Sequence, residues 1–108
     1  MSSRADAVDV TLHVDPACPA FDGHFPGAPV LPGAYLLALI VHELEQCRAL
    51  VALFEGRAME VQQVKFLAPV RPGDTLRLRL QPDDSGLDFA VQRDAMAIAR
   101  GRITAAAA

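Results

Sequence analysis

The chain has 108 residues, of which 52% are hydrophobic, and its formal net charge at pH 7 is −3. This length fits a single domain over residues 1–108, in which we expect residues 1–6 and 105–108 to be flexible ends. The weakly acidic balance argues against a protein that binds nucleic acid or a membrane surface. The longest apolar run covers residues 34–41, far short of the roughly 20 residues of a membrane span.

Two cysteines, Cys18 and Cys47, show no metal-ligand spacing, and the N-terminus lacks the apolar core of a signal peptide. Cysteines used in this way are typical of a reducing compartment. We therefore expect a cytoplasmic protein that holds no metal and no cofactor.

Residues 8–14 alternate between apolar and polar side chains, which predicts a half-buried strand. Residues 15–33 then carry five prolines and three glycines, a density that excludes regular structure. A loop of this length in a small domain is typically functional or disordered, and its bulky apolar residues favour order.

Residues 34–54 contain neither proline nor glycine and predict one continuous helix of about five turns that ends near Gly56. The first two turns are apolar on all sides, so we expect them to be buried on every side.

Four further strands are predicted over residues 61–70, 75–80, 87–94 and 95–104, with turns at 71–74 and 82–86. In the last strand Ala97, Ala99 and Gly101 share a face and are small enough for a helix to approach closely. The expected fold class is α+β, an antiparallel sheet wrapped around one long central helix. An exposed sheet edge would favour dimerisation.

The stretch Gly23-His24-Phe25-Pro26-Gly27-x-Pro29-Val30-x-Pro32-Gly33 resembles the active-site loop of the hot-dog-fold 3-hydroxyacyl-[acyl-carrier-protein] dehydratases, the FabA/FabZ group. Residues 64–76 are similar to the strand–turn–strand of the same family. The resemblance covers about residues 7–104. It implies a hot-dog homodimer with joined sheets and substrate tunnels at the dimer interface, acting on an acyl chain linked to acyl carrier protein.

The resemblance also implies roles for individual residues. His24 matches the catalytic histidine, the Gly33 N–H matches the group that holds the thioester carbonyl, and the Val30 carbonyl matches one that orients the histidine. Phe25 and Pro32 belong to the same substrate-binding loop. Dehydration needs a base at the α-carbon, an acid for the leaving hydroxyl and positive potential at the carbonyl oxygen. A helix that starts at Gly33 would supply that potential.

The chain departs from the family at the helix. The family carries a Glu or Asp fourteen residues after the histidine, contributed by the neighbouring subunit, and this chain has Ala38 there. His42 lies one turn further, rotated by about 40° and displaced by about 6 Å, and is either a substitute or a buried structural histidine. Glu45 lies about 10 Å beyond Ala38.

Several functions therefore stay open. The chain is either a dehydratase-like enzyme with water, His42 or the substrate in place of the acid, or a half-site subunit whose paralogous dehydratase partner donates the acid in a hetero-oligomer. Non-catalytic binding of acyl carrier protein is a third hypothesis, and a hot-dog thioesterase is the least favoured. Five arginines could dock the acidic carrier, although charged strand faces are usually just solvated: Arg71, Arg77, Arg79, Arg100 and Arg102.

Overall fold

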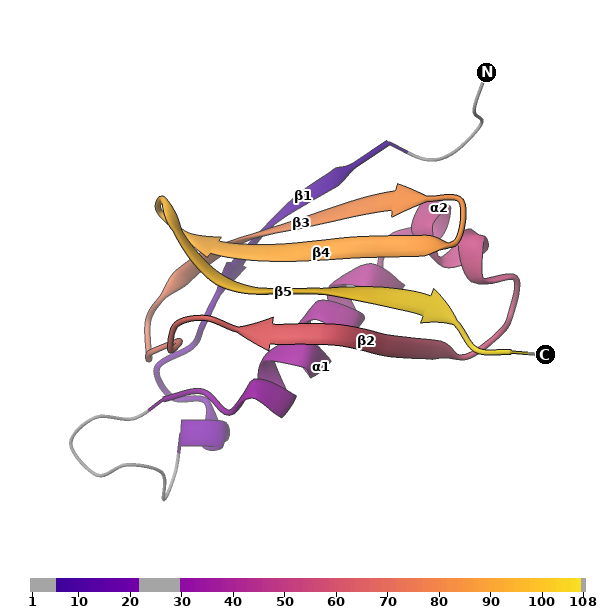
Figure 1. Cartoon of the computed structure of the whole chain (residues 1–108). Coiled ribbons are helices and arrows are strands. Elements are labelled where there is room, and N and C mark those ends of the chain that lie inside the picture. The colour runs from indigo at the N-terminus through magenta and orange to yellow at the C-terminus, as the bar shows by residue number, and fades with distance from the viewer. Residues whose placement is uncertain (1–5, 22–29, 108) are drawn as a thin grey trace.

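The computed structural model describes residues 6–21 and 30–107, which form one antiparallel sheet with a helix across one of its faces (Figure 1). The strands are β1 (Val8–His13), β2 (Met59–Phe66), β3 (Thr75–Asp83), β4 (Gly86–Arg93) and β5 (Met96–Ala105). The helical elements are η1 (Pro19–Phe21), α1 (Gly33–Glu45), α2 (Arg48–Val51) and η2 (Ala52–Phe54). The strand order is β1-β3-β4-β5-β2, so the predicted α+β hot-dog architecture is confirmed.

The core lies between α1 and the inner face of the sheet. Apolar residues at every second position of β3 and β4 are buried, because alternate side chains of a strand share one face. Helix α1 presents Leu36, Ile40 and Leu44, which are four residues apart and at most 2% exposed. No helix among the described residues is both long and apolar enough to cross a membrane.

The prediction of one continuous helix to the region of Gly56 is wrong. Helix α1 ends at Glu45, and Cys47 has extended backbone angles (φ −105°, ψ 102°) before α2 begins. At 100° per residue, a straight helix would also place Leu50 and Phe54 within about 40° of Leu36, so the direction of these two side chains does not by itself require a break. After the break both side chains are buried, at 0% and 2% exposure.

The first two turns of α1 are not buried on every side, contrary to the sequence prediction. Leu36 and Ile40 face the sheet, whereas Ala34, Tyr35 and Ala38 are exposed. Within the described residues, Ala34, Tyr35 and Ala38 thus form a largely apolar strip on the outward face of α1, called the outward strip below.

The small residues of β5 do not all share one face as predicted. A register shift between Val91 and Gln92 places both Ile98 and Ala99 in the core and leaves Ala97 exposed. A Cβ atom on Gly101 would lie 2.6 Å from Cζ of Phe89, so the close neighbour of this glycine is a ring of the adjacent strand.

In the sheet formed by residues 6–21 and 30–107, the two edge strands are β1 and β2. Strand β2 pairs there with β5 alone, and its register shifts between Gln62 and Lys65. Gln63 in this bulge has a left-handed backbone angle, φ 54°.

A candidate active site at the start of helix α1

The segment before α1 is held against the connection between β2 and β3. The Leu31 N–H donates a hydrogen bond of 2.8 Å to the carbonyl of Val70. The Pro32 carbonyl accepts from the N–H groups of Tyr35 and Leu36, at 3.0 and 3.1 Å. Pro32 has no N–H and gives no side-chain cap, so the Gly33 and Ala34 N–H groups begin the helix without an intrahelical acceptor. They lie at the positive end of the helix dipole, which favours a partly negative oxygen.

The ring of Phe66, from the inner face of β2, lies directly over Gly33. A Cβ atom on Gly33 would lie 2.7 Å from Cζ and 2.9 Å from Cε2 of that ring. Phe66 itself is 50% exposed. The helix start therefore combines N–H donors with an apolar wall, a combination that suits a carbonyl group attached to an acyl chain.

Tyr35 in the first turn of α1 lies near Cys18, the residue that directly precedes η1. Hydrogen bonding with Cys18, and after it electrostatic repulsion from that group, raises the pKa of Tyr35.

The predicted loop residues divide into two groups. His24 and Phe25 lie outside the described residues, and their roles remain predictions. Val30 and Pro32 are half-buried, and Leu31 between them is 5% exposed. The structure thus brings Val30, Pro32 and Gly33 together at the helix start.

Ala38 and His42 both lie on the exposed outward side of α1. They are four residues apart, so one turn of helix separates them. The side chain of His42 is exposed in this chain, so the core of the single chain does not bury it. Within the described part of the chain, no three His, Cys, Asp or Glu side chains gather closely enough to hold a metal ion.

Four of the five candidate docking arginines lie on strands β3 and β5 at positions that face away from α1: Arg77, Arg79, Arg100 and Arg102. Arg71 lies in the turn before β3, next to Val70. Two of them are in ion pairs: Arg79 with Asp9 at 2.9 Å, and Arg102 with Asp83 at 2.7 Å and Asp88 at 2.9 Å. Arg102, and after it the Ser85 N–H, hold the pKa of Asp83 well below its ordinary value.

Sequence reasoning missed Arg93, whose hydrogen bonds fix the connection between β2 and β3 on which the start of α1 is held. Its guanidinium donates to the Pro69 carbonyl at 3.0 Å and to the Asp74 carboxylate at 2.8 Å. These bonds brace the connection whose Val70 carbonyl holds Leu31. The only sequence signal is an arginine at the end of a strand, and many solvated arginines share that position.

Helix α1 starts at a glycine, beside a sheet of this topology and after a loop rich in His, Pro and Gly. These features together define the class of hot-dog-fold dehydratases. Within it, the family profile described as ApeI dehydratase (ApeI-like) matches residues 1–102, and the chain belongs to this family.

Similar proteins agree with this assignment. The 3-hydroxyacyl-[acyl-carrier-protein] dehydratase FabZ of Thermomicrobium roseum is 44% identical over 72 residues, which cover 58% of this chain and 44% of that protein. The chain spans about half the length of the curated relatives it matches.

Two solved structures share the fold. The dehydratase heterocomplex ApeI:P from Xenorhabdus doucetiae matches with 28% identity and a TM-score of 0.76, over 96% of this chain and 90% of that one. An uncharacterised protein from Erwinia carotovora subsp. atroseptica matches with 31% identity and a TM-score of 0.71, over 91% and 81% of the two chains.

Proposed function

We propose that this chain takes part in the dehydration of a 3-hydroxyacyl thioester, carried by acyl carrier protein, to a 2-enoyl thioester. The observation that supports this most directly is the start of α1, where the Phe66 ring packs against Gly33 and the helix begins without a side-chain cap. Membership of the ApeI-like dehydratase family and the similarity to FabZ proteins support the same reaction class.

In the proposed mechanism the thioester oxygen accepts a hydrogen bond from the Gly33 N–H. Negative charge develops on this oxygen as His24 removes a proton from the α-carbon, and the helix start stabilises it. The bond from the β-carbon to the hydroxyl group then breaks, and the hydroxyl leaves as water after receiving a proton. The acyl chain extends along apolar surface such as the Phe66 ring.

The source of that last proton is the open chemical question, because Ala38 has no acidic group. Proton transfer by a positioned side chain contributes typically about 10² to 10⁴-fold to a rate. His42, a water molecule or the substrate would have to replace this contribution in a homodimer of the chain.

A second candidate function is a half-site subunit, which supplies His24 and Gly33 while a paralogous hot-dog chain supplies the acid. The outward position of Ala38 on α1 favours this arrangement, since a partner packed on that side could bring a carboxylate near it. One similar structure is itself a dehydratase heterocomplex. The partner would pack on the outward strip of α1 and on the edge of β2.

The first experiment measures formation of the enoyl thioester by ultraviolet absorbance, with the chain alone and with a paralogous dehydratase added. Replacement His24→Ala should abolish turnover under both conditions, because it removes the base. The matched control His13→Ala removes an exposed histidine of β1 and should leave the rate unchanged. Undiminished turnover in His24→Ala would contradict the proposal.

The second experiment separates the two candidates with Ala38→Glu and its neutral control Ala38→Gln. If two copies of this chain complete the site, Ala38→Glu should raise kcat of the chain alone by about 10²-fold or more, and Ala38→Gln should not. Turnover that requires the paralogue and does not respond to Ala38→Glu in the chain alone would favour the half-site subunit.

A further inference from the structure

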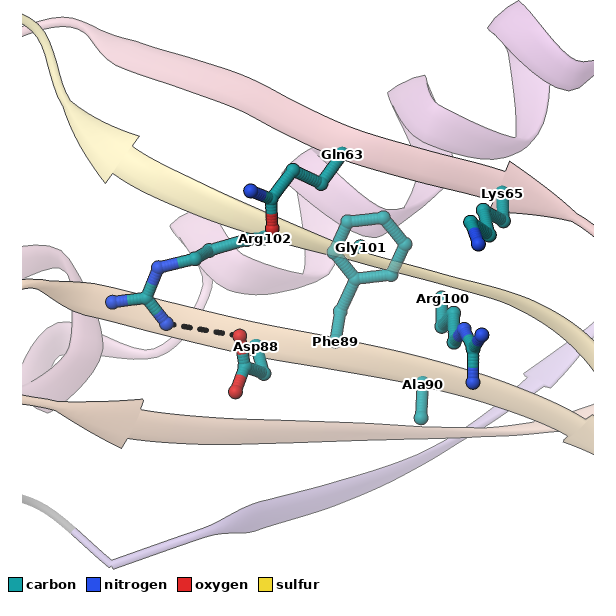
Figure 2. Close-up of a pocket in the computed structure, with 8 residues that line it drawn as sticks. All are labelled: Gln63, Lys65, Asp88, Phe89, Ala90, Arg100, Gly101 and Arg102. Carbon is teal, nitrogen blue, oxygen red and sulfur yellow. Dashed lines mark hydrogen bonds and ion pairs between the residues drawn. The ribbon is translucent and has the colours of Figure 1, made fainter.

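The sheet carries a hollow of about 600 Å³ on the face opposite to α1 (Figure 2). Residues from β2, β4 and β5 surround it, among them Gln63, Lys65, Asp88, Ala90, Arg100 and Arg102. Helix α1 lies behind the sheet in this view, so the hollow is separate from the helix start and from the proposed dehydration site.

Two cations in this hollow lie close enough for their mutual repulsion to lower the stability of the sheet. Lys65 pairs directly with Arg100 across strands β2 and β5, and like charges in directly opposite positions destabilise a sheet. Among the described residues neither side chain is in an ion pair, whereas Arg79 and Arg102 on the same face are paired with carboxylates.

The neighbouring positions leave these cations open to a ligand. Ala90 lies directly beside Arg100 on β4 and has no long side chain to cover it. Asp88 is already the acceptor of a hydrogen bond of 2.9 Å from Arg102, at the other end of the hollow. The positive potential is therefore concentrated between Lys65 and Arg100.

The backbone next to this pair is also strained. Gln63 has φ 54°, which is unfavourable for a residue with a side chain, at the register shift of β2. Figure 2 shows that its amide extends from β2 toward the Arg102 end of the hollow, away from Lys65 and Arg100. The strained bulge therefore borders the hollow and leaves the space between the two cations open.

We propose that this hollow binds a phosphate group, with Lys65 and Arg100 as the charged ligands. A phosphate group carries up to two negative charges and several acceptor oxygens, which matches two neighbouring cations. Binding would relieve the repulsion between Lys65 and Arg100. The proposal does not rest on the dehydration function, because it uses the other face of the sheet.

The test follows backbone amide shifts of the isotope-labelled chain during titration with inorganic phosphate and with glycerol 3-phosphate, at constant ionic strength. Saturable shifts are expected around Gln63, Lys65, Ala90 and Arg100. Lys65→Gln and Arg100→Gln should each weaken binding by about tenfold or more, since each removes a charged hydrogen bond. The control Arg48→Gln removes the same charge from exposed helix α2 and should change the affinity by less than about twofold.

Thermal unfolding gives an independent readout. Without phosphate, Lys65→Gln should raise the melting temperature, because it removes a like-charge pair. Added phosphate should stabilise the wild type and not this variant.

Three outcomes would overturn the proposal. The first is a set of shifts that do not saturate or that Arg48→Gln weakens equally. The second is a lower melting temperature in Lys65→Gln, which would make the cations structural. The third is binding of poly-glutamate in the hollow with no binding of either phosphate, which would assign the surface to an acidic protein.

Discussion

Two glycines of this chain lie beneath aromatic rings, and the two rings differ in their freedom to move. Phe66 over Gly33 is 50% exposed, whereas Phe89 over Gly101 is 1% exposed. A ring at the surface can rotate away from a new methyl group, but a ring in a packed core cannot do so without displacing its neighbours.

We therefore expect Gly101→Ala to lower the free energy of unfolding by about 1–3 kcal/mol through overpacking. Gly33→Ala should cost less stability but should impair turnover, because displacement of the Phe66 ring changes the wall beside the Gly33 N–H. Urea unfolding and the enoyl assay measure the two effects. A larger loss of stability in Gly33→Ala than in Gly101→Ala would contradict this explanation.

The ion pair of Asp83 with Arg102 makes part of the stability depend on pH. The pKa of Asp83 is lower in the folded state than the ordinary value of about 3.9, so the pair stabilises the fold above that value. This contribution is lost as the pH falls from about 5 into the acid range. The Asp83 side chain is 37% exposed, so solvent screening limits the contribution.

At pH 7, Asp83→Asn should lower the free energy of unfolding by about 1 kcal/mol. The difference from the wild type should shrink as the pH falls towards about 2.5, where the wild-type pair is progressively lost. Urea unfolding at several pH values checks this, with Asp94→Asn in the exposed turn between β4 and β5 as the control. A difference that grows in acid would show that the pair does not have the stated effect.

Among the elements, the pair α2 and η2 completes the core beyond the end of α1. After the break at Cys47 this short segment buries Leu50 and Phe54, while Leu53 remains half-buried.

Phe54→Ala should accordingly lower the free energy of unfolding by about 3–5 kcal/mol, because it opens a cavity in the core. The matched change Leu53→Ala should cost less than about 2 kcal/mol, since that side chain is already partly solvated. Chemical denaturation of both variants measures the difference. Equal costs would mean that the turn after Cys47 does not position Phe54 as a core residue.

At the scale of the whole molecule, the sheet formed by the described residues has two edge strands, β1 and β2, with different surroundings. Strand β2 has Val61 exposed to 38%, and Phe66 and the following Leu67 are about half exposed. Exposed apolar groups and unpaired backbone groups along one edge favour pairing with another chain. This agrees with the proposed association of two hot-dog chains through β2 and the outward strip of α1.

Val61→Lys should therefore weaken association by at least about tenfold, because it places a charge at the proposed interface. Thr11→Lys on the other edge strand, β1, is the matched control and should leave association unchanged. Light scattering after size-exclusion chromatography, over a range of concentrations, measures both. A Val61→Lys chain that associates like the wild type would exclude β2 as the interface.

The amino-acid sequence by itself was enough to predict the sheet, because alternation along residues 75–80 and 87–94 directly reflects which face is buried. The loop motif and the helix start at Gly33 could also be predicted from the sequence, because both depend on local residue types. The extent of the helix could not, because residues 34–54 contain no proline or glycine to mark the break at Cys47.

Contacts between distant segments were decided only by the tertiary structure. The Phe66 ring over Gly33 joins residues 33 positions apart, and the Arg93 brace joins β4 to the connection before β3. The same holds for the Lys65–Arg100 pair across β2 and β5. Local patterns report which face of a strand or helix is buried, but only the pairing of strands determines which side chains meet.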